Sequence, residues 1–320
     1  MSIRSSRFLR SAVAVLTTVL TTAAVSVAAS TGAQAAVNTS TSYLVVYNNN
    51  IENWLPSSCS DGYNWDRLIT YLKGRPLSPD IFTVQQVSNQ TQLTTLTQRL
   101  TDELPGTYAG QIAIASPGSM GYTSTCGKLK NQQTNAVIYR SDRFTYEAAT
   151  RWRSDAPADY DAGTGGCQNL EPTRSSQDRV HNIAVRLHDT LRNDKVSVTS
   201  IHWPTNTWHG PLCADENIKE ADEAMDRLGG ALKIVAGDAN AEPEDAGWWN
   251  DGKADGYRDP IAEKCGSRDC SSAYDTNGSR RIDFLLVKSG NGFSNAATIT
   301  PSMAGGEYSE HRAVTAYVNY

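Results

Sequence analysis

The sequence predicts an α/β (α+β) protein with a two-layered sheet core and helices outside. Short apolar runs typical of buried strands outnumber the segments with helical spacing. The helical segments also fall between the strands along the chain, which favours helices packed on the outer sides of the sheets. No internal repeat and no low-complexity tract appears beyond the first 35 residues.

The first 35 residues have the three parts of a secretory signal peptide. Three arginines lie within the first ten residues, small and apolar residues follow up to Ser30, and Ala33-Gln34-Ala35 is a small-x-small cleavage site. We therefore expect residues 1–35 to be removed and residues 36–320 to form one domain of a secreted, extracellular protein. Cleavage removes three arginines and no acidic residue, which takes the formal charge from −5 to −8. An acidic chain argues against tight non-specific binding of polyanions, although not against a local basic cleft.

Strands are predicted where short apolar runs are bounded by polar or turn-forming residues. One of them lies in the stretch 233–242, which reads KIVAGDANAE and stops at a turn. The other predicted strands are 42–51, 81–87, 108–115, 135–139, 143–152, 180–187, 196–201, 281–287 and 313–318.

Helices are predicted where apolar residues recur every three to four positions. Segment 65–73 has such a stripe and is followed by Gly74, and segment 91–104 has four spaced leucines followed by Pro105-Gly106. Segment 213–232 has the same spacing. Segments 154–177 and 248–259 are expected to be loops.

Six cysteines follow the predicted signal, and an even number in an exported chain predicts three disulfides. Only the pair Cys265–Cys270 is close enough in sequence to be proposed, so the pairing of the other four stays open. A zinc site is less expected because no Cys-x-x-Cys spacing occurs. The other four cysteines are Cys59, Cys126, Cys167 and Cys213.

The turn after the apolar run 234–236 carries a carboxylate and an amide. Asp238 and Asn240 are two residues apart, so on an extended backbone they point the same way. This pair suits a site for a hard metal ion and a phosphate, because one oxygen can reach a cation and one N–H can hold an anionic oxygen. The alternative is an ordinary turn in which Asp238 bonds its own backbone.

Polar residues also end several other predicted strands, and such residues form the sites of α/β proteins. Taken singly, each has a structural explanation: a turn for Asn50, a buried hydrogen-bonded histidine for His202, and an ion pair with a neighbouring arginine for Asp283. Their joint occurrence favours a site. The complete set is Asn50, Gln86, His202, Asp238, Asn240, Asp283 and His311.

The order of these residues resembles that of the endonuclease/exonuclease/phosphatase superfamily, which includes deoxyribonuclease I and bacterial sphingomyelinases. The resemblance implies a deoxyribonuclease I-like sandwich of two mixed sheets flanked by helices, with the site at one rim. It covers nearly the whole chain beyond the signal. The resembling segments are Asn49–Asn53, Pro79–Val87, Ser200–His202, Gly237–Ala241, Arg281–Leu285 and Ser309–His311.

The resemblance also implies catalytic roles. Asp238 would position or activate the attacking water, and Asn240 would hold the phosphate. His202 would bind the phosphate or assist the leaving group, and Asp283 would orient His311. These roles are consistent with hydrolysis of a phosphodiester, in which negative charge builds up on the phosphoryl oxygens and on the leaving oxygen.

The expected metal site contains two departures from the family pattern. Asn50 and Gln86 would lie at a divalent metal, with Mg²⁺ expected and Mn²⁺ or Ca²⁺ as alternatives, but the family usually has Glu in place of Gln86. The family also usually has Asp in place of Glu310. The loss of a charge at Gln86 predicts weaker Mg²⁺ binding, and Glu52 is a candidate replacement ligand because it would face the same way as Asn50.

The resemblance therefore predicts a secreted metal-dependent phosphodiesterase. The expected activity is that of a nuclease, and the expected protein is a monomer. The first alternative is a phospholipid phosphodiesterase similar to the sphingomyelinases, for which Trp248-Trp249 would serve as an exposed anchor at a membrane interface.

The second alternative is a catalytically weakened protein that binds a ligand in the cleft that holds the substrate in the enzymes of the family. Its basic rim would consist of Lys128, Lys130, Arg140 and Arg143. Arg140 and Trp203 are the candidate substrate-binding residues.

Overall fold

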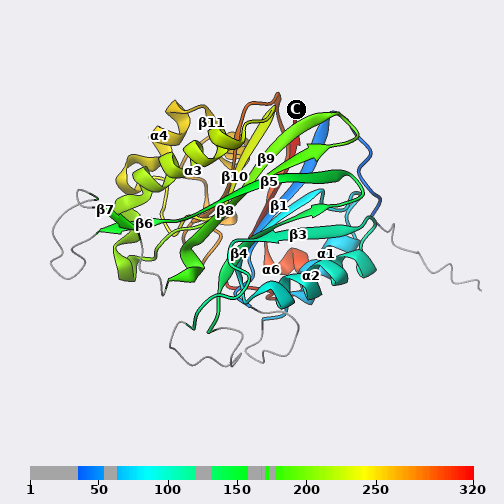
Figure 1. Cartoon of the computed structure of the whole chain (residues 1–320), viewed down its shortest axis with the longest axis horizontal. Helices are drawn as coiled ribbons and strands as arrows, with labels where there is room; N and C mark the ends of the chain where they lie inside the picture. The colour runs from blue at the N-terminus through cyan, green and yellow to red at the C-terminus, as the bar shows by residue number, and fades with distance from the viewer. Residues whose placement is uncertain (1–34, 54–62, 120–130, 158–166, 168–169, 173–176) are drawn as a thin grey trace, which may run out of the picture. The chain divides into compact units, whose positions relative to one another are not determined.

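The computed structural model describes residues 35–53, 63–119, 131–157, 167, 170–172 and 177–320 (Figure 1). Ala33–Tyr320 form one compact unit. Within the described residues, no helix is both long enough and apolar enough to cross a membrane. Most of the predicted signal peptide lies outside the described residues, so its removal stays a prediction.

Two six-stranded sheets form the centre of this unit, as the sequence predicts. Both sheets are mixed, because β1 pairs in parallel with β2 and β9 in parallel with β10, whereas the other pairings are antiparallel. The first sheet, in spatial order, contains β13 (Gly292–Ile299), β14 (Ala313–Asn319), β1 (Tyr43–Asn50), β2 (Ile81–Val87), β4 (Thr134–Arg140) and β3 (Tyr108–Ile112). The second sheet contains β11 (Tyr257–Arg258), β12 (Asp283–Lys288), β10 (Leu232–Asp238), β9 (Asp194–His202), β8 (His181–Asp189) and β5 (Phe144–Arg153).

Helices cover the outer face of each sheet. Figure 1 shows α1 (Asp66–Lys73) and α2 (Gln90–Glu103) beside the first sheet and α3 (Ala214–Leu228) and α4 (Trp248–Ala254) beside the second. A short separate ladder pairs β6 (Asp155–Pro157) with β7 (Leu170–Pro172). The helices are α1 (Asp66–Lys73), α2 (Gln90–Glu103), α3 (Ala214–Leu228), α4 (Trp248–Ala254), α5 (Pro260–Cys265) and α6 (Pro301–Ala304).

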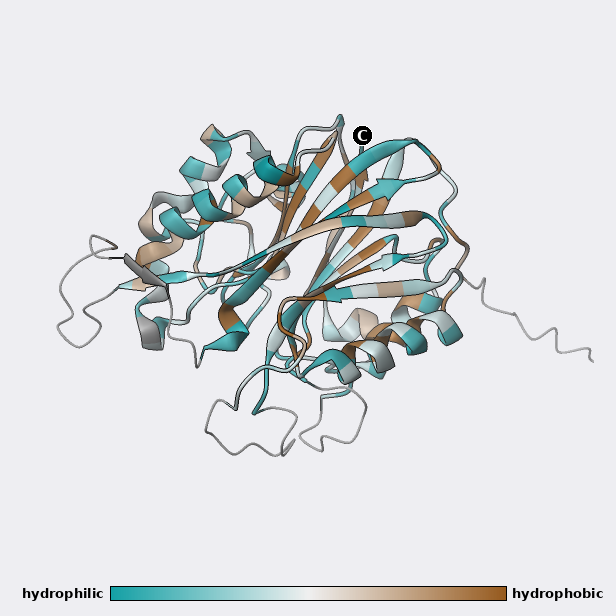
Figure 2. Cartoon of the chain, viewed as in Figure 1, coloured by the Kyte–Doolittle hydropathy of each residue, from teal (hydrophilic) through white to brown (hydrophobic). Residues whose placement is uncertain are grey.

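Both faces of the central strands are buried, which explains their continuous apolar runs. On β1, Leu44 and Val46 face the core between the two sheets, whereas Val45 and Tyr47 pack with α1 and α2. Hydrophobic stretches accordingly run along the strands in Figure 2. This arrangement fixes the register of the strands, because a slip of one residue would exchange the two faces.

The predicted loop at 248–259 is wrong. It contains the helix α4 and the short strand β11, because Trp248 and Trp249 are both buried in the core between α3 and the second sheet. The expected loop at 154–177 is interrupted by the paired strands β6 and β7. Three elements outside the two expected loops were not predicted either: β13, α5 and α6. The predicted helix 213–232 is shorter, since α3 ends at Leu228 before Gly229.

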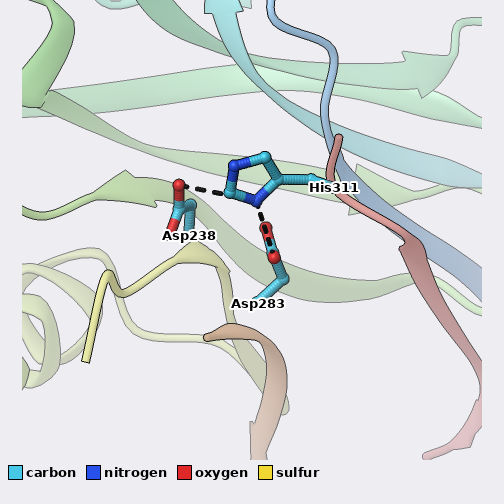
Figure 3. Close-up of side chains that lie close together, drawn as sticks. All are labelled: Asp238, Asp283 and His311. Carbon is cyan, nitrogen blue, oxygen red and sulfur yellow. Dashed lines mark hydrogen bonds and ion pairs between the residues drawn. The ribbon is translucent and has the colours of Figure 1, made fainter. Parts of the chain in front are cut away.

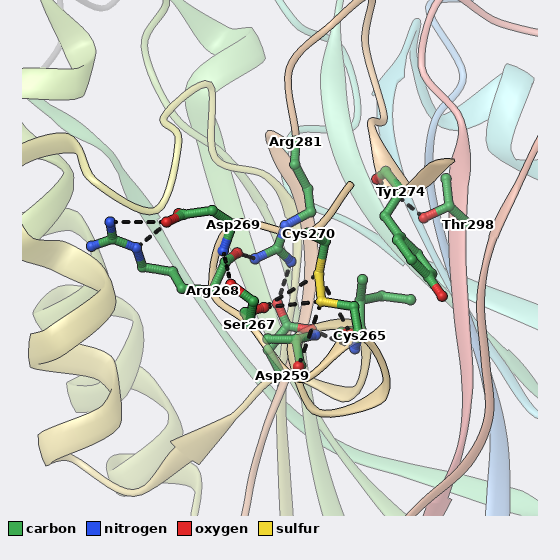
Figure 4. Close-up of a disulfide and its surroundings, with 11 residues drawn as sticks. Asp259, Cys265, Ser267, Arg268, Asp269, Cys270, Tyr274, Arg281 and Thr298 are labelled. Carbon is green, nitrogen blue, oxygen red and sulfur yellow. Dashed lines mark hydrogen bonds and ion pairs between the residues drawn. A yellow bond between two sulfur atoms is a disulfide. The ribbon is translucent and has the colours of Figure 1, made fainter. Parts of the chain in front are cut away.

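Two disulfides lie within the described residues. Cys265 is bonded to Cys270, as predicted, and Cys167 is bonded to Cys213. Figure 4 shows the first of these beside Arg281. The remaining two cysteines lie outside the described residues, so a third disulfide stays a prediction.

Candidate active site

Three polar side chains surround one carboxylate oxygen of Asp238, which ends β10: Asn50 from the end of β1, His202 from the end of β9, and His311 from just before β14. Oδ2 of Asp238 lies 3.0 Å from Nδ2 of Asn50 and 3.5 Å from Nε2 of His202. It also lies 3.8 Å from Nδ1 of His311 (Figure 3). Strand pairing places Asp238 opposite both His202 and Asp283, so backbone register sets much of this geometry.

His311 and Asp283 form a buried pair. Nδ1 of His311 lies 2.9 Å from Oδ2 of Asp283. Burial alone would lower the pKa of His311, but the charges of Asp283 and Asp238 outweigh it and raise the pKa to about 10. The ring therefore carries a positive charge at neutral pH.

The second histidine is in the opposite state. Burial lowers the pKa of His202 to about 4, although the charge of Asp238 acts in the other direction. His202 is therefore neutral at physiological pH. The site thus combines one neutral and one protonated imidazole beside the same carboxylate, which is an arrangement suited to proton transfer.

Asn240 is held tightly beside Asp238. Its backbone N–H donates to Oδ1 of Asp238 at 2.9 Å, and its Nδ2 donates to the carbonyl of Trp203 at 2.9 Å. An amide nitrogen has two hydrogens, so one remains for an anionic oxygen. The residue has a φ of 50°, a left-handed conformation that costs free energy outside glycine and is typical of functional sites.

Glu52 is brought to the same rim by a turn directly after β1. Its carboxylate Oε2 accepts hydrogen bonds from the hydroxyl of Ser309 at 3.2 Å and from the backbone N–H of Glu310 at 2.9 Å. Its own N–H donates to Oδ1 of Asn50 at 3.2 Å. Because its charge contributes to the raised pKa of His311, Glu52 belongs to the electrostatic field of the site.

Gln86 lies at a bulge near the end of β2, where the pairing with β4 shifts between Val84 and Val87. Its φ is 59°, and its Oε1 accepts a hydrogen bond of 3.3 Å from Nε2 of Gln133. The neighbouring Gln85 pairs with Asn50 of β1, so Gln86 reaches the same edge of the sheet.

The side-chain oxygens on this rim are suitable ligands for a hard divalent cation. Asn50, Glu52 and Gln86 offer amide and carboxylate oxygens, the ligands that Mg²⁺ and Ca²⁺ prefer. Asp283 adds a carboxylate whose Oδ1 is buried and has no hydrogen-bond partner among the described residues. Asp238, Asp283 and His311 also lie close enough together to hold a metal ion, which would require His311 to release its proton.

Glu310 lies on the exposed side of this rim, next to the buried Ser309 and His311. Its side chain is exposed and lines a pocket of about 330 Å³ together with Tyr63, Glu307 and Arg312. Burial raises the pKa of the Tyr63 hydroxyl, and the charges of Glu310, Glu52 and Glu307 raise it further. This side of the rim is therefore acidic.

Arg179 is a site residue that the sequence reasoning missed. Its positive charge lowers the pKa of His202, and its Nη2 lies 3.4 Å from the hydroxyl of Thr205, just beyond β9. The residue belongs to a 3-10 turn, Asp178–Val180, directly before β8. The only signal in the sequence was an arginine just ahead of a predicted strand, which is too common to single out.

The expected basic rim does not form from Arg140 and Arg143. Both are buried and form ion pairs with Asp80, at 3.0 Å and 3.2 Å. Asp80 immediately precedes β2, whereas the site lies where β2 ends, so these arginines stabilise the opposite end of the first sheet. Lys128 and Lys130, the other expected members, lie outside the described residues.

The expected tryptophan contacts are also absent. Trp203 is only 1 % exposed and packs edge-on against Trp248, with ring centroids 5.4 Å apart. Its ring cannot stack on a substrate, although its backbone holds Asn240 and Asp238. Trp248 and Trp249 are buried as well, so they provide no membrane anchor.

Taken together, these features define a class of fold. Two mixed six-stranded sheets lie between helical layers, and polar side chains gather where strands of both sheets end. This is a deoxyribonuclease I-like fold, as the sequence predicts, and it is shared with solved structures of endonuclease/exonuclease/phosphatase family proteins. No protein-family model matches the sequence. A search of curated proteins finds no match either.

Particular solved structures carry this likeness. The catalytic domain of human Nocturnin, with a bound sulfate anion, is similar with a TM-score of 0.61 and 14% identity, covering 86% of this chain and 94% of that one. An endonuclease/exonuclease/phosphatase family protein from Bacteroides thetaiotaomicron has a TM-score of 0.59 and 17% identity, covering 87% and 95%. D. rerio TDP2, complexed with a single-strand DNA product, has a TM-score of 0.57 and 16% identity, covering 87% and 99%.

Proposed function

We propose that this protein is a secreted, metal-dependent phosphodiester hydrolase that cleaves extracellular nucleic acid. The observation that carries the proposal is the convergence of Asn50, His202 and His311 on Oδ2 of Asp238. A structural ion pair would not need two histidines in opposite protonation states beside one carboxylate. The solved structure of TDP2 with a DNA product supports the choice of nucleic acid as substrate.

The chain's own residues supply the acid, the base and the anion-binding groups. Asp238 orients the attacking water and accepts its proton. Protonated His311, held by Asp283, donates to the phosphoryl oxygen, where negative charge develops. As the bond between phosphorus and the leaving oxygen breaks, the N–H of the neutral His202 ring donates a hydrogen bond to the leaving oxygen, which takes up a proton from solvent.

A divalent cation held by Asn50, Glu52 and Gln86 would neutralise charge on the phosphoryl oxygens when bound. The remaining amide hydrogen of Asn240 and the guanidinium of Arg179 add donors for the phosphate. Glu52 supplies the negative charge that the family usually has at the position of Gln86. We propose Mg²⁺ because every candidate ligand on this part of the rim is an oxygen.

The test is a substrate panel. The purified protein is incubated with plasmid DNA, RNA and sphingomyelin, each with Mg²⁺, Mn²⁺, Ca²⁺ or a chelator. Cleavage of nucleic acid in the presence of a metal ion, with no cleavage in the presence of the chelator, supports the proposal. Cleavage of sphingomyelin alone would instead indicate a phospholipid phosphodiesterase, and nucleic-acid binding without any turnover would indicate a weakened relative.

A further inference from the structure

The second sheet extends the catalytic rim beyond His202. β8 runs antiparallel to both β9 and β5, so β5 and β9 end at the same rim. Arg153, the last residue of β5, pairs with His181 at the start of β8. The next residue of β8, Asn182, accepts a 2.8 Å hydrogen bond from the backbone N–H of His202. Arg153, His181 and His202 therefore lie in a row across three neighbouring strands.

Two arginines of β5, an edge strand of the second sheet, lie on the side that faces β3, an edge strand of the first sheet. Arg151 and Arg153 are two residues apart and so point to the same face of the strand. Nε of Arg151 donates to the carbonyl of Ile112 in β3 of the first sheet, at 3.1 Å. Trp152, between them, points the other way and packs against the core under α3.

The positive charge of these two arginines is not neutralised within the described part of the chain. Neither Arg151 nor Arg153 forms an ion pair with another described residue, and Nε of Arg153 has no hydrogen-bond partner there. Burial lowers the pKa of His181, the charges of Arg153 and Arg151 lower it further, and nearby Asp178 only partly opposes them. Two unpaired arginines beside each other are unfavourable unless an anion binds there.

The opposite side of the catalytic centre carries the opposite charge. Glu52, Glu307 and Glu310 gather there around Tyr63. A polyanion leaving the centre in that direction meets the exposed carboxylates of Glu307 and Glu310, with Arg312 as a cation among them, whereas in the direction of β5 it meets arginines without an ion-pair partner among the described residues. The charge distribution thus selects one direction along the rim.

We propose that Arg151, Arg153 and Arg179, which we call the arginine strip, bind successive phosphates of a nucleic-acid strand that extends from the scissile phosphate toward β5. The proposal rests on the proposed function, because it assigns the path of the polymer through that same site. It adds a binding surface for the substrate beyond the cleaved bond.

Strand geometry sets the reach of the strip. Neighbouring strands are about 4.8 Å apart, which places Arg153 roughly 10 Å across the sheet from His202. A nucleic-acid strand carries one phosphate per about 3.4 Å of helix axis. In a duplex, Arg153 therefore meets a phosphate about three nucleotides from the one that is cleaved, and in an extended single strand, where phosphates are farther apart, it meets a nearer one. A substrate with a single phosphate does not reach it.

The test compares a long and a short substrate in Arg151→Gln, Arg153→Gln and the double variant. Arg192→Gln is the matched control, because Arg192 is an exposed arginine in the turn between β8 and β9, at their other end. Binding of a labelled 12-nucleotide single-stranded DNA is measured by fluorescence anisotropy in chelator at several salt concentrations. Cleavage is measured as kcat/KM on the same DNA and on bis(p-nitrophenyl) phosphate.

We expect the double variant to bind the DNA about tenfold more weakly, with a salt slope reduced by about 1.4 because two phosphate contacts are lost. Its kcat/KM on DNA should fall by a similar factor, whereas its kcat/KM on bis(p-nitrophenyl) phosphate and the behaviour of Arg192→Gln should stay at the wild-type level. Unchanged DNA binding in the double variant, or an equal loss on both substrates, would overturn the proposal. If the wild type neither binds nor cleaves nucleic acid, the proposed function fails first, and this is visible before any variant is compared.

Discussion

Nδ1 of His311 lies 2.9 Å from Oδ2 of Asp283, and the two residues come from different sheets. His311 precedes β14 of the first sheet, and Asp283 begins β12 of the second. The pair therefore forms only when the sheets are packed together. Any substitution that loosens this packing should damage the site before it unfolds the protein.

Removal of either histidine should abolish most of the activity. We expect His311→Ala and His202→Ala each to lower turnover by at least about 10²-fold, the usual contribution of a positioned acid or base. Turnover of plasmid DNA and thermal melting are measured side by side. Full activity in both variants would show that the assigned site is not the active site.

Asp283→Asn should lower the pKa of His311, because the carboxylate at 2.9 Å is the main charge that raises it. Its protonated form would then be lost at a lower pH than in the wild type. We expect the alkaline limb of the pH profile of kcat/KM to move to lower pH, and the His311 resonances to titrate earlier in NMR. An unchanged pH profile and titration would exclude Asp283 as the partner that sets the protonation of His311.

Glu52 and Gln86 can be separated by a metal titration. Glu52→Gln should weaken Mg²⁺ binding, because it removes the negative charge from the proposed oxygen ligands Asn50, Glu52 and Gln86. Gln86→Glu should tighten Mg²⁺ binding unless the added charge repels Glu52 and raises the pKa of one of the two acids. Activity is followed against Mg²⁺ concentration in the wild type and both variants. If neither variant changes the dependence, the metal is held elsewhere.

Gly237 is required by close packing of two strands. Its φ is 154°, and a Cβ atom at this position would lie 2.0 Å from the carbonyl oxygen of Ile201 in β9. We expect Gly237→Ala to separate β10 from β9, to lower the melting temperature markedly and to displace Asp238. Gly247→Ala is the control, because Gly247 also has a positive φ of 77° but has no atom within 4 Å of the added Cβ. Similar melting temperatures for the two variants would mean that the clash is relieved without cost.

Glu220 on α3 should make stability depend on pH. Burial, helped by the charge of Asp155, raises its pKa to about 8 from an ordinary value of 4.5. The folded state therefore holds a proton that the unfolded state has released between these two values. The stability contributed by protonated Glu220 is fully present below pH 4.5 and is lost as the pH rises through 8.

The variant Glu220→Gln keeps the neutral side chain at every pH. It should melt like the wild type at pH 5 and at a higher temperature than the wild type at pH 9. Glu263→Gln, which removes a carboxylate from an exposed ion pair with Arg258, should show no such difference. Parallel melting curves of wild type and Glu220→Gln across this range would contradict the raised pKa.

Local pattern was sufficient for most of the strands and for the core of the site. The apolar run before Gly237 predicts β10, because a strand buried on both faces must be apolar throughout. The polar residues that end β1, β9 and β10 point to the rim, and the structure brings Asn50, His202 and Asp238 together there. Local sequence is enough in these cases because each side chain sits at a strand end whose direction the apolar run already defines.

Long-range packing decided the rest. Arg140 and Trp203 look like binding residues in the sequence, but Asp80 and the core under α4 bury them. Nothing in the sequence singled out Arg179 or Arg153, because their proximity to His202 depends on how β5, β8 and β9 pair. The sequence by itself determined which residues could do the chemistry. Only the tertiary structure decided which charges surround them. Charges interact through space, and folding brings together residues that lie far apart in the sequence.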